Sequence, residues 1–385
     1  GRPPVPVPAP EAAAVDVTGA GDAFAAAYLL ARAGGADPAE AAGAGTRLAA
    51  RAVATRGAWP THLPPGGGAE YPLTAAGHRA DHRQGNAPLM DSRIVVADRI
   101  ANASAVVALE SSVLAQGLPS PANLESADAK QAAVAKSDAE PAVIGVIAGR
   151  VIVGADPHEV QALASGSVRW KVTVRDLPYV VARGLDGATT VSATAFAAEA
   201  AGIGVMATGG IGGIHFGGGD ISADLPQLAR SRLTVVCSGP KHVADAAATI
   251  EWMETHGVQV VGYRTDRLPG FLATGRLPLE QVADDVAQVV ELIQVRQALG
   301  SPGALVLCQD PPTSAAMDPE ELAELAAEGA AAAGDAGVFG KARTPFELDW
   351  LHRRTGGRSL VANLALLEAN AGLAGEIAAG LAATG

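Results

Sequence analysis

Lysine is scarce in this sequence. Of 28 lysine and arginine residues, the lysines are Lys130, Lys136, Lys171, Lys241 and Lys341. Because arginine does not deprotonate in proteins, a retained lysine indicates a position where an amine is needed. The polar helical pattern around Lys130 and Lys136 predicts solvated side chains, whereas Lys241 follows a glycine-rich loop and an apolar run. Lys241 is therefore the stronger candidate for a reactive amine.

Aromatic residues, cysteines and net positive charge are also scarce. Aromatics make up 4% of the chain and the net charge is −12, which argues against nucleic acid as a partner. Two cysteines, Cys237 and Cys308, lie in apolar runs and are predicted to be reduced core thiols of a cytoplasmic protein. The N-terminal residues do not resemble a signal peptide, and the uncharged stretch near 200–219 is too rich in glycine for a membrane helix. We therefore expect neither a nucleic-acid nor a membrane partner.

The chain is long, and apolar runs alternate with helical patterns along it. Its 385 residues suggest two to three domains, and 49% hydrophobic content is enough for a sizeable core. Apolar runs alternate with helical patterns, including predicted helices over 123–136, 243–254, 279–299 and the C-terminal 25 residues or so. Strands alternating with helices predict a layered α/β domain. We expect an N-terminal segment over 1–58, a linker over 59–92 and the main domain over 93–385.

The N-terminal segment carries a glycine turn before a helix. Gly19, Ala20, Gly21 and Asp22 precede an apolar helical run. Such a turn makes an anion hole from backbone amides, and Asp22 could act as a base beside it. This resembles the C-terminal motif of ribokinase-type (PfkB) sugar kinases. Since the resemblance covers only about 58 residues, without a sugar-binding part, we expect no kinase activity from them alone; kinase activity within a bifunctional fusion is an alternative.

A second glycine-rich stretch, 208–241, ends in Lys241. Two carboxylates, Asp220 and Asp224, lie on its loop, and an apolar run over 233–237 predicts a buried strand. Backbone amides, paired carboxylates and a lysine are typical of a site for a phosphorylated ligand with a metal. A tight-turn loop between buried strands is the alternative. Likewise, Glu110 follows an apolar run, which is typical of catalytic groups in α/β enzymes but also of helix-capping acids.

Nine motifs, in this order along the chain, together resemble one known family. They are ALESSVLAQGLPSPAN, KVTVRDLP, GATTVSAT, ATGGIGGIH, DISADLPQLA, VVCSGPK, VVGYRTDRLPGF, GKARTPF and TGGRSLVANLALL. The resemblance is to the pseudouridine-5'-phosphate glycosidase, or indigoidine synthase A-like, family and runs from about residue 93 to the end. It implies an α/β/α domain with a mixed sheet, a homotrimer, and reversible cleavage of pseudouridine 5'-phosphate to uracil and ribose 5-phosphate with a divalent metal, usually manganese.

The same resemblance implies a role for individual residues. Lys241 matches the nucleophile that forms a Schiff base with the sugar, and Glu110 matches the proton donor. Asp220 matches the metal position, with Asp224 reaching the metal or its waters as a further expectation. The positions that match substrate contacts are Lys171, Val191, Ser222, Ala223 and Asp224.

Three positions depart from the family pattern. Phe216 stands where the family carries an arginine after His215, in a loop shorter by three residues. Val174 replaces a second arginine, and Asp310 replaces an asparagine. The first departure predicts weaker binding of the substrate phosphate. A family member that binds sugar phosphates with impaired turnover is therefore a second alternative.

Overall fold

The computed structural model describes residues 20–53, 93–216, 219–338 and 340–384. The chain divides into two compact units, Gly1–His82 and Arg83–Gly385. The predicted linker over 59–92 and Gly19 of the kinase-like motif lie outside the described residues.

The described part of the first unit is a pair of helices, α1 (Ala20–Ala33) and α2 (Pro38–Val53). Asp37 accepts hydrogen bonds from the amides of Ala39 and Glu40 at 2.8 and 2.9 Å, which starts α2. The two helices pack closely because Gly45 lies against the Phe24 ring, where a Cβ atom would come within 2.6 Å. The kinase-like motif was predicted to precede the helix, but α1 begins at Ala20, so Ala20, Gly21 and Asp22 are the first residues of the helix itself.

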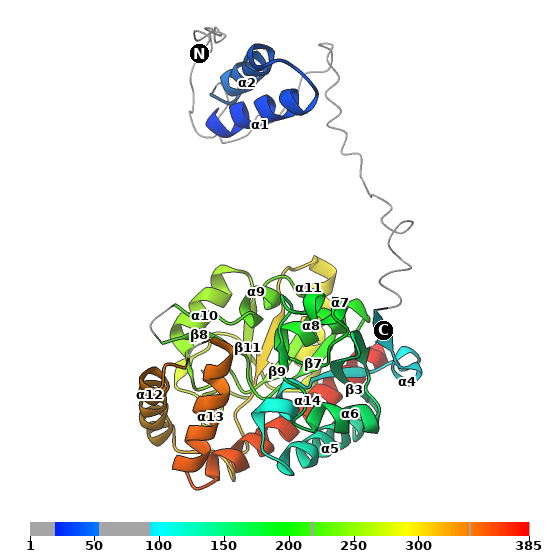
Figure 1. Ribbon diagram of the computed structural model, residues 1–385, viewed down its shortest axis with the longest axis vertical. Coiled ribbons are helices and arrows are strands. Elements are labelled where there is room, and N and C mark those ends of the chain that lie inside the picture. Colours follow the sequence, from blue (N-terminus) through cyan, green and yellow to red (C-terminus); the bar gives the residue numbers. More distant parts are fainter. Residues whose placement is uncertain (1–19, 54–92, 217–218, 339, 385) are drawn as a thin grey trace. The chain divides into compact units, whose positions relative to one another are not determined.

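The second unit is built on an eleven-stranded mixed sheet (Figure 1). Its main path, in spatial order, is β1 (Ile94–Val96), β4 (Arg150–Val153), β3 (Glu140–Ile147), β2 (Val106–Glu110), β7 (Val205–Ala207), β9 (Thr234–Cys237), β15 (Leu305–Cys308), β11 (Gln259–Tyr263) and β14 (Val282–Ala283). Two further strands, β6 (Gly187–Thr189) and β5 (Trp170–Val172), extend from β3. From β3 to β14 every pair on the main path is parallel, whereas β4 and β6 run antiparallel to β3.

Both faces of the sheet are covered, which explains its continuous apolar strands. Figure 1 shows α7, α8 and α9 on one side and α5, α6 and α14 on the other. The first face carries α7 (Leu177–Ala182), α8 (Val191–Ala200), α9 (Asp224–Leu228) and α10 (Ala246–Thr255). The second face carries α5 (Ala122–Ala135), α6 (Pro157–Ala164), α11 (Val286–Leu299) and α14 (Arg358–Thr384). Successive residues of β2 alternate between the two cores, with Ala108 in one and Val107 and Leu109 in the other. The predicted layered α/β/α architecture with a mixed sheet is confirmed.

A third, smaller core joins the remaining helices to α14. It contains side chains of α12 (Pro319–Asp335), α13 (Arg343–Arg354) and α14, together with Phe271 and Leu272. The short elements are α4 (Asp98–Ala101), η1 (Val113–Gly117), η2 (Gly340–Ala342), and the strand pairs β8 (Ile214–His215) with β10 (Ala244–Asp245) and β12 (Arg267–Leu268) with β13 (Leu277–Pro278). By length and composition α14 could cross a membrane, but half of its most apolar window is buried and it packs along α5 and the sheet.

Two predicted helix starts are wrong. The helix predicted over 279–299 begins at Val286, because part of the preceding apolar stretch forms β14 at the sheet edge and Asp285 caps the helix. The helix predicted over 243–254 begins at Ala246, where Asp245 accepts a hydrogen bond from the Ala248 amide. In both cases the apolar pattern of the helix extends to residues before the capping aspartate. Those residues form a short strand and not the first turn of the helix.

Candidate active site

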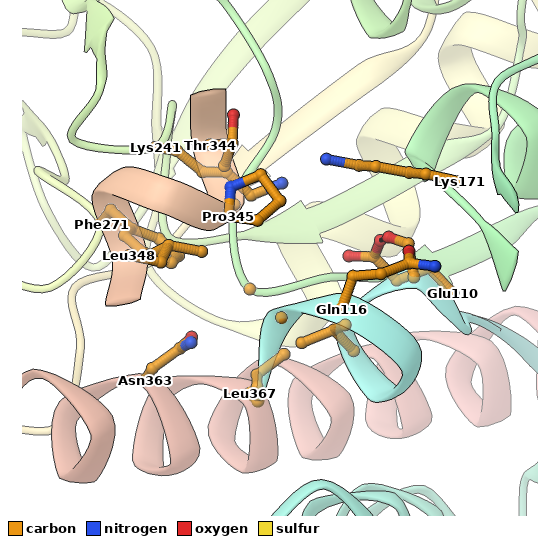
Figure 2. A pocket seen from close by; sticks show the side chains of 15 residues that line it. Glu110, Gln116, Lys171, Lys241, Phe271, Thr344, Pro345, Leu348, Asn363 and Leu367 are labelled. Atoms are coloured by element: carbon orange, nitrogen blue, oxygen red, sulfur yellow. Dashed lines mark hydrogen bonds between the residues drawn. The ribbon is translucent and has the colours of Figure 1, made fainter. Parts of the chain in front are cut away.

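Glu110 and Lys241 meet at one edge of the sheet. Glu110 is the last residue of β2, and Lys241 follows the end of β9 by four residues. Because β2, β7 and β9 are parallel neighbours, their carboxyl ends lie side by side. Both side chains line a small inner cavity of about 40 Å³, together with Lys171 from β5. In Figure 2 the two lysines point toward one another, with Glu110 beside them.

The carboxyl group of Glu110 is held by two hydroxyl groups. The side chain is 4% exposed, and its Oε2 accepts a hydrogen bond from Ser112 Oγ at 2.6 Å. Its Oε1 accepts a hydrogen bond from Thr208 Oγ1, directly after β7. The Thr208 carbonyl in turn accepts a hydrogen bond from buried Asn370 Nδ2 at 2.9 Å. Contacts from two neighbouring strands and α14 therefore fix the orientation of this carboxyl group.

Lys130 is buried near Glu110, so the prediction that it is solvated is wrong. It lies on the covered face of α5 and is 4% exposed. Burial lowers its pKa from 10.5 to about 8, and the negative charge of Glu110 opposes that shift. The small residues around Lys130 give α5 no clear apolar face, so the pattern could not show which side faces α14. Lys136, predicted the same way, has a 73% exposed side chain, as expected.

The loop that presents Lys241 depends on a glycine. Gly239 has φ +84, and a Cβ atom there would lie 2.2 Å from the Pro269 carbonyl oxygen. The Lys241 amide donates to the Ile211 carbonyl at 2.9 Å, which ties this loop to the glycine-rich loop after β7. Burial lowers the pKa of neighbouring His242 to about 4, and the charge of Lys241 acts in the same direction. His242 is therefore neutral at physiological pH.

Asp224 serves to hold the glycine-rich loop. It is 5% exposed; its Oδ1 accepts from the Ser192 amide and its Oδ2 from the Gly212 amide, both at 2.9 Å. A Cβ atom at Gly212 would lie 2.2 Å from Ser222 Oγ, so only glycine allows this approach. Both carboxylate oxygens are thus occupied by backbone amides, which is a structural role that the paired-carboxylate pattern did not predict.

Asp220 is the more open of the two carboxylates. Its carbonyl oxygen accepts from the His215 amide at 2.9 Å. Burial lowers the pKa of His215; the charge of Asp220 opposes this shift, and the charges of Arg343 and Lys171 add to it. Within the described ranges, no group of three or more His, Cys, Asp or Glu side chains is arranged to hold a metal ion. Any cation here would therefore take few ligands from the protein.

Most of the predicted substrate contacts lie around a second, polar cavity of about 370 Å³. Its lining includes Glu110, Lys171, Thr190, His215, Asp220, Ser222, Ala223, Asp224, Lys241 and Thr344. Val191 is different: its side chain belongs to the core and is 1% exposed, although it starts α8 directly after Thr190. Only the backbone of Val191 is therefore suited to contact a ligand.

The other wall of the inner cavity was not predicted from the sequence. This wall comes from η1, the loop after β12, α13 and α14, and consists of Gln116, Phe271, Thr344, Pro345, Leu348, Asn363 and Leu367 (Figure 2). Several of these residues lie in the quoted motifs GKARTPF and TGGRSLVANLALL, but nothing in their local pattern indicates a cavity.

Two of the positions that depart from the family pattern, Phe216 and Asp310, differ in their surroundings. Phe216 is 52% exposed. A different arginine, Arg343, lies on α13 near His215, whose pKa its charge lowers, and its Nε donates to Glu347 Oε1 at 2.7 Å. Asp310 accepts from the Gly275 amide at 3.1 Å, and burial raises its pKa. The arginine near His215 is therefore Arg343, which is ion-paired with buried Glu347.

Comparison with known proteins agrees with this geometry. Residues 95–380 match the model of the indigoidine synthase A-like protein family, and residues 4–64 match that of the pfkB family of carbohydrate kinases. A pseudouridine-5'-phosphate glycosidase of Methylobacterium nodulans is 42% identical over 298 residues, covering 76% of this chain and 88% of the relative. That of Herpetosiphon aurantiacus is 44% identical over 285 residues, covering 73% of this chain and 94% of the relative.

Two solved structures are similar to the main unit. An indigoidine synthase A-like protein from Thermotoga maritima has a TM-score of 0.69 at 34% identity, covering 75% of this chain and 96% of that one. The prealnumycin C-glycosynthase AlnA, in complex with ribulose 5-phosphate, has a TM-score of 0.70 at 35% identity, covering 76% and 98%. With a family model matched over most of its length and relatives above 40% identity, this chain belongs to the indigoidine synthase A-like family.

Proposed function

We propose that this chain reversibly cleaves the carbon–carbon glycosidic bond of pseudouridine 5'-phosphate, giving uracil and ribose 5-phosphate. The observation that carries the proposal is the placement of Lys241 and Glu110 on one cavity, at the positions where the motifs require an amine and an acid. The relatives named pseudouridine-5'-phosphate glycosidases support it, since they match the same region of the chain.

The bond to be broken explains why an amine is needed. A carbon leaving group departs poorly by the oxocarbenium route of ordinary glycosidases. In the proposed reaction the Lys241 amine bonds to C1' as the ribose ring opens, and the ring oxygen takes a proton. Protonation of uracil C5 then allows the C1'–C5 bond to break, and its electron pair restores the uracil double bond. The resulting imine takes up water, which releases ribose 5-phosphate and the free amine.

Glu110 is proposed to move the proton at uracil C5. Its carboxyl group lines both the inner and the polar cavity, so it can reach the junction between base and sugar. The hydroxyl groups of Ser112 and Thr208 hold it in one orientation, which removes an entropic cost from the proton transfer. In the reverse direction the same group accepts the C5 proton.

The polar cavity is proposed to hold the sugar phosphate. Lys171 and Arg175 line it, and Arg343 adds positive charge near His215. Asp220 would hold a manganese or magnesium ion, because hard cations take one or two carboxylates in such sites. When bound, the ion would neutralise phosphate charge. Chelation should then abolish turnover and added Mn²⁺ restore it, and Asp220→Ala should lose both bound Mn²⁺ and rate; full activity and metal content in that variant would refute this assignment.

The domain division, cytoplasmic location and homotrimeric assembly are proposed together with the activity. The two stretches matched by different family models, 4–64 and 95–380, support separate kinase-derived and glycosidase parts. Sedimentation analysis of the full chain measures the assembly directly, with a mass of about three chains expected.

The activity is tested most simply in the synthetic direction. The full chain is incubated with uracil, ribose 5-phosphate and Mn²⁺, and the C-nucleotide is followed by its absorbance change and identified by mass spectrometry. We expect pseudouridine 5'-phosphate to form. Tight binding of ribose 5-phosphate without any product would instead support a member of the family with impaired turnover.

A further inference from the structure

The inner cavity joins two larger cavities, one at each end. It shares lining residues with the polar cavity, namely Glu110, Ser112, Lys171, Lys241 and Thr344. It shares a different set with an outer cavity of about 310 Å³, namely Gln116, Gly117, Pro345, Leu348 and Asn363. The three cavities therefore form a row, with the inner cavity between a polar end and an outer end.

The outer cavity combines apolar walls with polar groups that make no hydrogen bond to any residue that the structure describes. Its walls include Leu118 and Leu272, which are 8% and 1% exposed. His352 Nδ1 is buried without a hydrogen-bond partner among the described residues. The buried Asn363 side chain likewise makes no hydrogen bond within the described part of the chain. Apolar walls with a few convergent polar groups are typical of a small-molecule subsite.

The chemistry of the proposed reaction determines how the uracil ring lies along the row of three cavities. Uracil C5 forms the bond to C1', so it must lie near Lys241 and Glu110, where the inner and polar cavities meet. In a six-membered ring C2 lies opposite C5, flanked by N1 and N3. The N1–C2–N3 edge therefore faces the Gln116 and Asn363 end of the inner cavity, beyond which the outer cavity opens.

We propose that the outer cavity is a subsite for a substituent on this edge of the base, so that the enzyme accepts pyrimidine-2,4-diones larger than uracil. The inference rests on the proposed glycosidase function and extends its substrate class. The covalent steps do not change: C5 bonds to C1' of the imine and its proton passes to Glu110. The ring oxygen then bonds to C1' as the Lys241 amine leaves with the proton of that oxygen. Uracil alone would leave the outer cavity to water, for which about 310 Å³ is ample room, whereas an apolar ring would displace that water.

Substituted uracils test this inference in the wild-type enzyme. With ribose 5-phosphate and Mn²⁺, kcat/KM for C-nucleotide formation is measured for uracil, 1-benzyluracil, 3-benzyluracil and 6-benzyluracil. We expect at least one of the two N-benzyl compounds to react within about tenfold of uracil, since apolar burial offsets its added bulk. The 6-benzyl compound, whose substituent is next to C5, should not react.

The outcomes separate the two proposals. If uracil reacts and both N-benzyl compounds are more than about a hundredfold poorer, the outer-cavity inference is overturned while the proposed function stands. If uracil itself gives no C-nucleotide, the proposed function fails instead.

A matched pair of variants locates the effect. Leu360 lines the outer cavity at the start of α14, whereas the next residue, Val361, is 60% exposed and lies outside it. Leu360→Trp should lower the ratio of N-benzyluracil to uracil kcat/KM by about tenfold or more, and Val361→Trp should leave it unchanged. Because each ratio compares two substrates in one enzyme preparation, partial loss of folding cancels. An unchanged ratio in Leu360→Trp would overturn the inference.

Discussion

The polar cavity and the inner cavity differ in where their residues come from. Much of the polar cavity's wall comes from the segment between β7 and α9, which supplies His215 in β8 together with Asp220 and Ser222. The apolar wall of the inner cavity comes from Phe271 and Leu348, together with Leu367 on α14. The charged groups thus lie in or just beyond the strands of the sheet, whereas the shape around the base depends on how α13 and α14 pack.

We expect the charged residues to carry the chemistry and the apolar wall to set only the shape around the base. Replacing Lys241 should therefore lower turnover more than any other change. Lys241→Ala should reduce turnover by more than about a thousandfold, because no other group forms the imine. Lys241→Arg keeps the positive charge but cannot act as a nucleophile, so it should not restore activity. Steady-state rates of both variants measure this, and a rescue by arginine would show that Lys241 acts only as a charge.

Glu110 should have the next largest effect. Glu110→Gln keeps the shape and the contact with Ser112 but removes the proton-transfer group, so turnover should fall about 10²–10⁴-fold. Imine formation with ribose 5-phosphate does not require the C5 proton, so reductive trapping should persist in this variant. Loss of trapping together with turnover would instead indicate that Glu110 is needed to position Lys241.

Lys130 is a buried charge that lines neither the inner nor the polar cavity. Its pKa of about 8 in the folded state, against 10.5, means that between pH 8 and 10.5 the unfolded chain binds a proton that the folded chain does not. Stability should therefore rise with pH across that window, and the full penalty of about 3 kcal/mol applies below pH 8.

Replacing Lys130 by methionine removes this penalty. Lys130→Met should raise the free energy of unfolding at pH 7 by up to about 3 kcal/mol and abolish its rise between pH 8 and 10.5. Denaturant titrations at several pH values measure both effects. Lys136→Met is the matched control on the same helix, because its 73% exposed side chain should change stability little. Destabilisation in Lys130→Met would mean that its pairing with Glu110 outweighs the cost of burial.

The smallest effect should come from the N-terminal unit. Removing residues 1–90 should leave C-nucleotide formation within about twofold, since every described residue of the three cavities lies beyond that range. The kinase-like motif keeps Asp22, but phosphoryl transfer depends mainly on positioning two bound substrates. The full chain should therefore not phosphorylate pseudouridine with ATP, and phosphorylation that is lost in Asp22→Ala would contradict this expectation.

The origin of each residue also explains what could be predicted from the sequence. Glu110 ends an apolar strand, and Asp220 and Lys241 follow glycines beyond strand ends. Local sequence patterns of this kind predicted these residues and the layered fold. The burial of Lys130 and the cavity wall at Asn363 arise where α5, η1 and α14 pack together. Because such contacts join residues far apart in the chain, no local sequence pattern indicates them. The role of Asp224 was missed for a related reason, because its partners are the backbone amides of Ser192 and Gly212.

The central claim is that Lys241 bonds covalently to the sugar. The full chain is incubated with ribose 5-phosphate and Mn²⁺, reduced with borohydride, digested and mapped by mass spectrometry. We expect one reduced ribose 5-phosphate adduct, on Lys241, absent from Lys241→Ala and absent without reductant. An adduct on Lys171 or Lys130 instead, or no adduct in an enzyme that forms pseudouridine 5'-phosphate, would contradict it.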